Sequence, residues 1–375
     1  MINRIYDELE NLLEPNKVIV LYGPRRVGKT TILNKFTKTT NLKFRFDTGE
    51  DLGVQKVFLS QSLDTLKQYA AGYEVIIIDE AQLISNVGLG LKMMVDQIPG
   101  IKIIVSGSAS LDLSNKIGEP LVGRKWTKIL YPVSQFELIK ESSQYDLEQT
   151  KEKYLIFGSY PEVLTSQTNQ RKQLILQEVV SSYLLKDILS IESIKNPELL
   201  QKLLKLLAFQ IGSEVSLSEL ATQLEINRNT VSRYIYLLEQ SFIIYSLSGY
   251  SRNLRKEVTK KKKYYFWDNG IRNGIINNFN PLDTRDDLGQ LWENFLVAER
   301  LKKQSYQPVF ANNYFWRTWD QKEIDWVEMR GGKLFGFEFK FGKNKSKSKQ
   351  MWLETYPGEA EFSYINTSNY LDFIT

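Results

Sequence analysis

Hydrophobic residues gather in short runs along roughly the first third of the chain, and a stretch with helical periodicity separates each run from the next. Runs of this length and composition are typical of buried strands. Strands that alternate with helices predict βαβ units and therefore a mostly parallel sheet. The predicted strands are Lys17–Tyr22, Lys43–Asp47, Glu74–Asp79, Ile101–Ser106 and Thr127–Tyr131.

The pattern becomes helical after Pro132, and the Gly and Pro of Phe157–Pro161 mark a tight connection between two of the helices. Two short amphipathic helices and a β-hairpin are then predicted, followed by an amphipathic helix from Leu288 and two strands. The chain is therefore predicted to be an α/β protein of several domains. The predicted domains are 1–132, 133–195, 196–267 and 268–375.

The composition agrees with a globular protein of more than one domain. At 375 residues the chain is too long for a single ordinary domain. It contains 42% hydrophobic and 25% charged residues, and no apolar run reaches the length of a membrane span. The segment from Met1 to Pro15 is acidic and amphipathic, unlike a signal peptide. We therefore expect a cytoplasmic protein without a membrane partner.

The chain contains neither cysteine nor histidine. This excludes disulfides, Cys/His zinc sites and every hydrolytic mechanism that uses histidine as the base. Any metal must be held by oxygen ligands, which favours Mg²⁺ or Mn²⁺, and any general base must be a carboxylate or a lysine. The net charge of +5 is too small to indicate binding to a polyanion by itself.

The segment GPRRVGKT, Gly23–Thr30, directly follows the first predicted strand and opens a predicted helix. This context and the pattern G-x-x-x-x-G-K-[ST] predict ATP binding, whereas an ordinary turn before a helix is the alternative. Backbone N–H groups would face the phosphates, Lys29 would add a positive charge, and the Thr30 hydroxyl would bind Mg²⁺. The predicted nucleotide contacts are Gly23, Pro24, Arg25, Arg26, Val27, Gly28, Lys29, Thr30, Thr31, Asp79, Ser106 and Ser108.

The third predicted strand ends in two acids, Asp79 and Glu80. Beside a phosphate loop, the first acid is expected to hold the water shell of Mg²⁺ and the second to polarise the attacking water. The pair therefore favours ATP hydrolysis over binding alone. The alternative is a strand that ends in two solvated acids.

Three more polar residues lie next to predicted strands. Ser106 and Ser108 end the fourth strand, where a sensor of the γ-phosphate and a plain helix cap or turn are equally good interpretations. Arg124 precedes the fifth strand, where an arginine of an oligomeric ATPase can act on the neighbouring subunit's nucleotide. That catalytic role requires a homo-oligomer, and an ordinary surface arginine is the alternative.

Residues 216–240 predict a helix-turn-helix, and the following hairpin resembles a wing whose tip is rich in lysine and arginine. The second helix would present polar and basic side chains to DNA, mainly to its phosphate backbone. A protein-interaction module with solvated lysines is the alternative. The predicted nucleic-acid contacts are Arg228, Asn229, Thr230, Ser232, Arg233, Lys260, Lys261, Lys262 and Lys263.

A second group of acids is predicted near the C-terminus. Glu338 and Lys340 are two residues apart on a predicted strand and so point to the same face. If Asp325 lies on the neighbouring strand, Asp325 and Glu338 can hold a divalent ion, with Glu293 joining from the helix and Lys340 orienting or deprotonating water. This arrangement suits metal-assisted phosphodiester hydrolysis.

The chain resembles the prokaryotic AAA-plus ATPases that join a P-loop ATPase with a helical lid to a winged helix and a C-terminal restriction-endonuclease-like domain. The segments that carry the resemblance are GPRRVGKT (23–30), VIIIDE (75–80), VSGSAS (105–110), GSYPEV (158–163), WENFLVAE (292–299), EIDWVE (323–328) and FEFK (337–340). The resemblance implies these folds without deciding the activity. Two functions remain open, an ATPase that acts on DNA, with or without cleavage, and a nucleotide-dependent switch that regulates a partner.

Overall fold

The computed structural model describes residues 2–108, 120–184, 196–251, 261–307, 309–318, 320–342 and 348–375. Lys260 and the rest of the predicted hairpin tip at 252–259 lie outside the described residues. By its internal contacts the chain divides into two units. Unit 1 comprises Met1–Pro132, Tyr183–Ile194 and Gln240–Phe242, and unit 2 comprises Val133–Ser182, Lys195–Glu239 and Ile243–Thr375.

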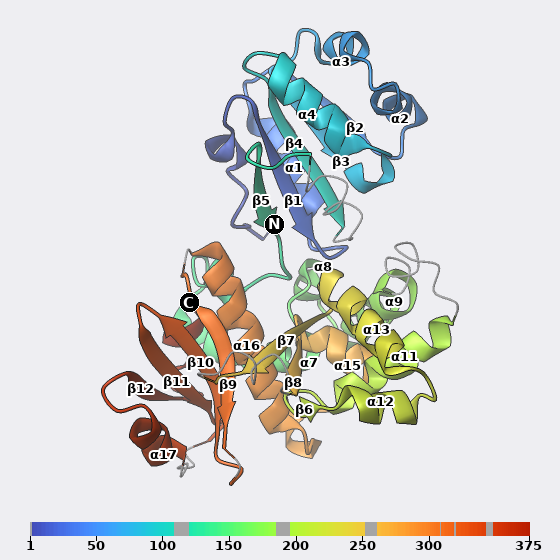
Figure 1. Cartoon of the computed structure of the whole chain (residues 1–375). Helices are drawn as coiled ribbons and strands as arrows, with labels where there is room; N and C mark the ends of the chain where they lie inside the picture. Colours follow the sequence, from blue (N-terminus) through green and yellow to red (C-terminus); the bar gives the residue numbers. More distant parts are fainter. Residues whose placement is uncertain are drawn as a thin grey trace. The chain divides into compact units, whose positions relative to one another are not determined.

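Unit 1 contains a five-stranded parallel sheet in the order β2-β3-β4-β1-β5 (Figure 1). The predicted parallel sheet is confirmed, and no strand end differs from the predicted one by more than two residues. The apolar runs of β1 and β3 are buried on both faces, as expected for central strands of a parallel sheet. The strands are β1 Lys17–Gly23, β2 Phe44–Thr48, β3 Val75–Asp79, β4 Lys102–Ser108 and β5 Lys125–Ile129.

The helices of unit 1 cover the sheet and complete its core. On one face, side chains of β1, β3 and β4 pack with Phe58, Leu66 and Leu91 from three helices. Helix α1 contacts β1, β3 and β4, and begins at the end of the phosphate loop. The helical elements of unit 1 are η1 Leu9–Leu12, α1 Lys29–Thr39, α2 Leu52–Leu59, α3 Leu63–Ala70, η2 Ala81–Leu83 and α4 Val87–Gln97.

Unit 2 begins with helices that we expected to form an ATPase lid. In the structure α7 and α9 pack against α15 of unit 2, so they are part of its core. None of the helices in the described ranges is both long and apolar enough to cross a bilayer. The helical elements that lie wholly or mainly in this unit are α6 Gln135–Leu138, α7 Gln144–Phe157, α8 Pro161–Thr165, α9 Asn169–Glu178, η3 Val179–Leu184, α11 Pro197–Phe209, α12 Leu217–Gln223, α13 Arg228–Gln240, α15 Asn269–Ile276, η4 Leu282–Thr284, α16 Leu288–Tyr306, α17 Ser348–Thr355 and α18 Tyr370–Ile374.

The strands of unit 2 form one seven-stranded sheet in the order β12-β11-β10-β9-β7-β8-β6 (Figure 1). The hairpin β7–β8 after α13 joins this sheet because β7 pairs with β9, with Ser248 opposite Tyr314. The predicted domain boundary at 267/268 therefore falls within one continuous sheet. The strands are β6 Glu214–Val215, β7 Ile244–Gly249, β8 Lys262–Phe266, β9 Asn312–Arg317, β10 Glu323–Arg330, β11 Lys333–Phe339 and β12 Ala360–Ile365.

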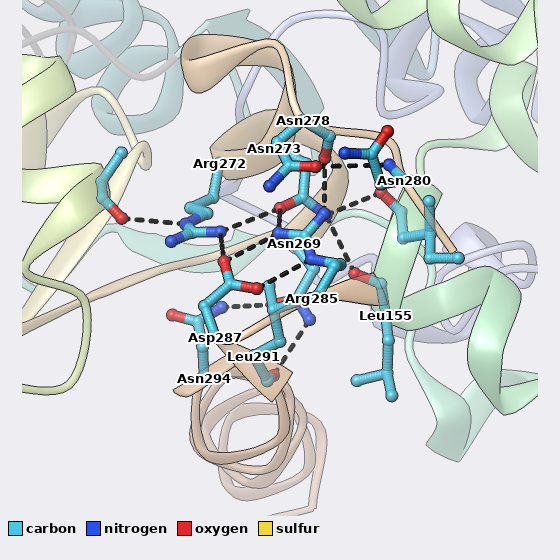
Figure 2. A network of polar contacts seen from close by, with 12 residues as sticks. Leu155, Asn269, Arg272, Asn273, Asn278, Asn280, Arg285, Asp287, Leu291 and Asn294 are labelled. Atoms are coloured by element: carbon cyan, nitrogen blue, oxygen red, sulfur yellow. Dashed lines mark hydrogen bonds and ion pairs between the residues drawn. The ribbon is translucent and has the colours of Figure 1, made fainter. Parts of the chain in front are cut away.

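A buried polar network connects the helices of unit 2 (Figure 2). Arg272 and Arg285 both bind the carboxylate of Asp287, and Arg285 does so at 2.7 and 2.8 Å. Arg272 also donates to the carbonyl of Ala208 in α11, and the Asn273 amide donates to carbonyls at the end of α7. These hydrogen bonds satisfy backbone groups at helix ends, which explains how α7, α11 and α15 share one core.

Candidate functional site

The phosphate loop lies between the carboxyl end of β1 and the start of α1. Gly28 has a φ of 100°, and Gly23 has no room for a side chain because one would collide with the carbonyl of Leu130. Arg26, with a φ of 62°, also has a left-handed backbone. Left-handed backbone at positions such as these turns neighbouring N–H groups toward one side, which favours the binding of an anion.

Lys29 is the first residue of α1 and is buried, with 5% of its surface exposed. Its ammonium donates to the carbonyls of Gly23 at 2.8 Å and Pro24 at 2.9 Å. The positive charge is therefore held inside the loop by neutral acceptors. A phosphate that entered the loop would be a stronger acceptor than these carbonyls.

Thr30 and Asp79 lie together at the edge of the sheet. The Thr30 hydroxyl donates to Oδ2 of Asp79 at 2.6 Å, and the hydroxyl of buried Ser106 donates to Oδ1. Parallel β3 and β4 bring Asp79 and Ser106 to the same edge. One hydroxyl oxygen and one carboxylate are hard ligands of the kind that Mg²⁺ prefers, so these residues fit that ion.

Glu80 follows β3 with a left-handed backbone, φ 50°. Its N–H donates to Asp79 Oδ1 at 3.1 Å, and its carboxylate accepts a hydrogen bond from the Gln82 amide. That amide also donates to the Ser108 hydroxyl at 3.1 Å. Gln82 was not among the predicted site residues, although its position two residues after Glu80 was a signal for this contact.

Arg124 lies just before β5, at the amino edge of the sheet, and pairs with Asp96 at 2.5 Å. The phosphate loop follows the carboxyl end of β1, and parallel strands place these two edges on opposite sides of the sheet. Arg124 is therefore far from the phosphate loop of its own chain. A catalytic role requires a second copy and stays a hypothesis.

In unit 2, three of the predicted acids and Lys340 lie around a pocket of about 490 Å³ or directly beside it. Glu293 comes from α16, Asp325 from a β-bulge in β10, and Glu338 from β11. The Phe339 N–H donates to Asp325 at 2.7 Å, and Lys340 pairs with Glu338 at 3.0 Å. The predicted helix and two antiparallel strands thus bring these side chains together.

Lys263 contradicts its predicted role as a DNA contact. Only 2% of its side chain is exposed, and its ammonium lies 3.1 Å from Glu293 and also contacts Glu323. The alternation of β8 turns Lys263 inward while Lys262 is exposed. Burial lowers the pKa of Lys263, but the surrounding carboxylates, led by Glu293 and Glu323, raise it above the usual range overall. Lys263 is therefore charged.

The titrating groups of the pocket are strongly shifted. Burial, followed by the charge of Glu293, raises the pKa of Asp325 to about 8. Burial lowers the pKa of Lys340, but its hydrogen bond to Glu338 and the charges of the surrounding carboxylates together outweigh this and raise it overall. Lys340 therefore keeps its proton more firmly than a free lysine, and its role in orienting or deprotonating water stays a prediction.

The exposed face of α13 carries most of the other predicted nucleic-acid contacts. The exposed residues of α13 recur about once every helical turn, which places them on one face of the helix. They are Arg228, Asn229, Ser232, Arg233 and Tyr236. Thr230 is half-buried. Lys261 and Lys262 are also exposed, at the start of β8.

Three family models match successive parts of the chain. Residues 15–139 match the model of an AAA domain. Residues 148–282 and 288–364 match two domains of unknown function, DUF8612 and DUF4143. The AAA match covers the sheet and phosphate loop of unit 1 and favours ATPase activity.

Relatives align with almost the whole chain. An uncharacterized protein of Mycobacterium tuberculosis is 24% identical over 373 residues, which cover 96% of this chain and 80% of the relative. An uncharacterized protein of Methanocaldococcus jannaschii is 25% identical over 349 residues, covering 87% of this chain and 75% of the relative. The similarity thus spans both units in bacteria and archaea.

Arg4 is a second residue of the AAA-like unit that the sequence analysis missed. It is buried, and its guanidinium donates to the carbonyl of Val27 in the phosphate loop and to that of Tyr131 at 2.6 Å. Arg4 precedes Val27 by 23 residues and belongs to no motif, so no sequence pattern predicted this contact. Arg4 connects the loop to the segment that follows β5.

Arg4→Gln is expected to raise the Kd for ATP roughly tenfold. The loss of a charged hydrogen bond, about 1.5 kcal/mol, would loosen the loop at Val27. Titration with a fluorescent ATP analogue measures the change, and Lys43→Gln, at an exposed position of unit 1, is the control. An unchanged Kd in folded Arg4→Gln would show that the loop does not depend on this contact.

Thr30 and Asp79 are suited to a divalent ion, whereas the pocket of unit 2 is not. The ammonium of Lys263 occupies the space between Glu293 and Glu323. No group of three or more acids with a metal-binding arrangement is present in the parts of the chain that the structure describes. We therefore derive no metal-dependent step at this pocket.

Proposed function

We propose that this protein binds ATP with Mg²⁺ in unit 1 and hydrolyses the γ-phosphate bond. The observation that carries the proposal is the contact of Thr30 with Asp79, with Glu80 as the next residue at the same sheet edge. The loop in front of them has the backbone of an anion site and contains a buried lysine. Binding without hydrolysis would give Glu80 no role.

Each residue has a separate task in this proposal. Lys29 exchanges its two carbonyl acceptors for phosphate oxygens and holds their charge. Glu80 accepts a hydrogen bond from the attacking water and orients it, while Gln82 fixes the Glu80 carboxylate. Bound Mg²⁺, on Thr30 and Asp79, would neutralise charge on the phosphates.

The test of this function is Mg²⁺-dependent release of phosphate from ATP by the purified chain. The account expects turnover that Glu80→Gln abolishes without preventing ATP binding. Phosphate release that does not respond to Glu80 would contradict the assigned mechanism.

We propose DNA as the partner of α13, because its exposed face carries Arg228 and Arg233 together with polar side chains. The order of α11, β6, α12, α13, β7 and β8 agrees with the winged helix that the sequence predicts, and this agreement supports the proposal. Lys261 and Lys262 extend the basic surface, and Lys263 does not contribute to it.

Arg228→Ala is expected to weaken DNA binding. It should also reduce the steepness with which the logarithm of the binding constant falls against the logarithm of the salt concentration by about 1, which corresponds to the loss of one phosphate contact. Fluorescence anisotropy with labelled duplex at several salt concentrations measures both. Arg171→Ala is a matched control, since Arg171 is also an exposed arginine in the first turn of a helix. If both variants lost DNA affinity equally, or if neither lost any, the result would favour a nucleotide-dependent switch that binds a protein partner.

A further inference from the structure

The pocket of unit 2 collects carboxylates from three elements that lie apart in the chain. Glu293 lies on α16, Glu323 and Asp325 on β10, and Glu214 on β6. Negative groups this close repel one another and require a cation. Lys263, Arg317 and Lys340 line the same pocket, and of these only Lys263 is almost completely buried.

Lys263 sits at the centre of the acids. Its ammonium contacts Oε1 of Glu323 and lies 3.1 Å from Oε1 of Glu293. The Tyr265 hydroxyl donates to the same Glu293 oxygen at 2.7 Å, so that oxygen has two donors. Alternation along β8 directs Lys263 and Tyr265 to this one carboxylate.

The remaining carboxylates keep part of their capacity to bind a cation. Asp325 accepts one N–H, from Phe339, and Oε1 of Glu338 accepts from Lys340. Oε2 of Glu338 is buried and has no hydrogen-bond partner among the residues that the structure describes. A buried carboxylate oxygen without a donor is costly and is a position that a metal ion would satisfy.

We propose that Lys263 is an internal counter-ion that keeps divalent cations away from the carboxylates of Glu293, Asp325 and Glu338. A divalent ion would have to approach a fixed positive charge and displace the Lys263 ion pairs. Removing that charge while keeping the length of the side chain leaves the acids with excess negative charge and an open space. Met is the matched replacement because it is unbranched and neutral.

The experiment measures Mn²⁺ binding to the full chain without nucleotide, by electron paramagnetic resonance. The chains compared are the natural chain, Asp325→Asn, Lys263→Met and the double variant. The part of the binding that Asp325→Asn removes reports on this pocket, because the nucleotide site keeps Asp79 in every chain. Lys262→Met, at the exposed neighbour, is the control for loss of a lysine.

The expected result is equal Mn²⁺ binding by the natural chain and Asp325→Asn, and one additional ion per chain in Lys263→Met that the double variant loses. Asp325-dependent binding by the natural chain would overturn the proposal. A folded Lys263→Met that gains no ion would also overturn it. The comparison of the natural chain with Asp325→Asn does not need the Lys263 variant, so the proposal stays testable if Lys263→Met fails to fold. Neither this comparison nor that of Lys263→Met with the double variant depends on ATP hydrolysis.

Discussion

Glu80→Gln is expected to lower kcat for ATP hydrolysis by about 10²- to 10⁴-fold and to leave the Kd for ATP within about a factor of two. Glutamine keeps the shape of the side chain and cannot accept a proton from water. The residues expected to bind phosphate and Mg²⁺, Lys29 and Thr30, are unchanged. Binding and chemistry should therefore separate in this variant.

Phosphate release measures kcat in this experiment, and equilibrium titration with an ATP analogue measures Kd. Glu10→Gln replaces an exposed acid in η1 of the same unit and should change neither quantity. If folded Glu80→Gln kept its turnover, another group would have to orient the water. If it lost ATP binding, Glu80 would be a structural residue of the loop.

The second large effect is expected in the stability of unit 2. Asp287→Ala removes the acid that compensates Arg272 and Arg285, whose side chains are 2% and 0% exposed (Figure 2). Two buried guanidinium groups would lose their counter-charge, which is expected to destabilise the folded unit by about 3–5 kcal/mol. This is a large part of the stability of an ordinary domain.

Urea denaturation followed by tryptophan fluorescence measures this loss. All but one of the seven tryptophans of the chain lie after residue 266, in unit 2. Asp283→Ala, at an exposed acid four residues earlier, should leave the midpoint almost unchanged. Equal midpoints for both variants would mean that the network adds little stability.

The ATPase-like sheet could be predicted from the sequence because each of its signals is local. Uninterrupted apolar runs such as that of β3 need burial on both faces, and the loop Gly23–Thr30 must follow a strand to work. The structure places Thr30, Asp79 and Ser106 within hydrogen-bonding distance, as the parallel strand order requires.

The carboxylate pocket could be predicted only in part. Period-two alternation placed Glu338 and Lys340 on one face, and the adjacent strand brought in Asp325. Lys263 was assigned to the wrong surface because a run of lysines looks solvated, whereas β8 is exposed at Lys262 and buried from Lys263 onward. Which sheet that strand joins depends on the pairing of β7 with β9, which no local pattern encodes.

The most direct test of the central claim is steady-state phosphate release by the natural chain at saturating MgATP, with Lys29→Ala as the matched blank. Lys29 is the buried cation of the phosphate loop, and its loss should remove tight ATP binding. The account predicts turnover that requires Mg²⁺ and falls to the level of the blank in Lys29→Ala. Equal phosphate release by both chains, or none by the natural chain with or without DNA, would contradict it.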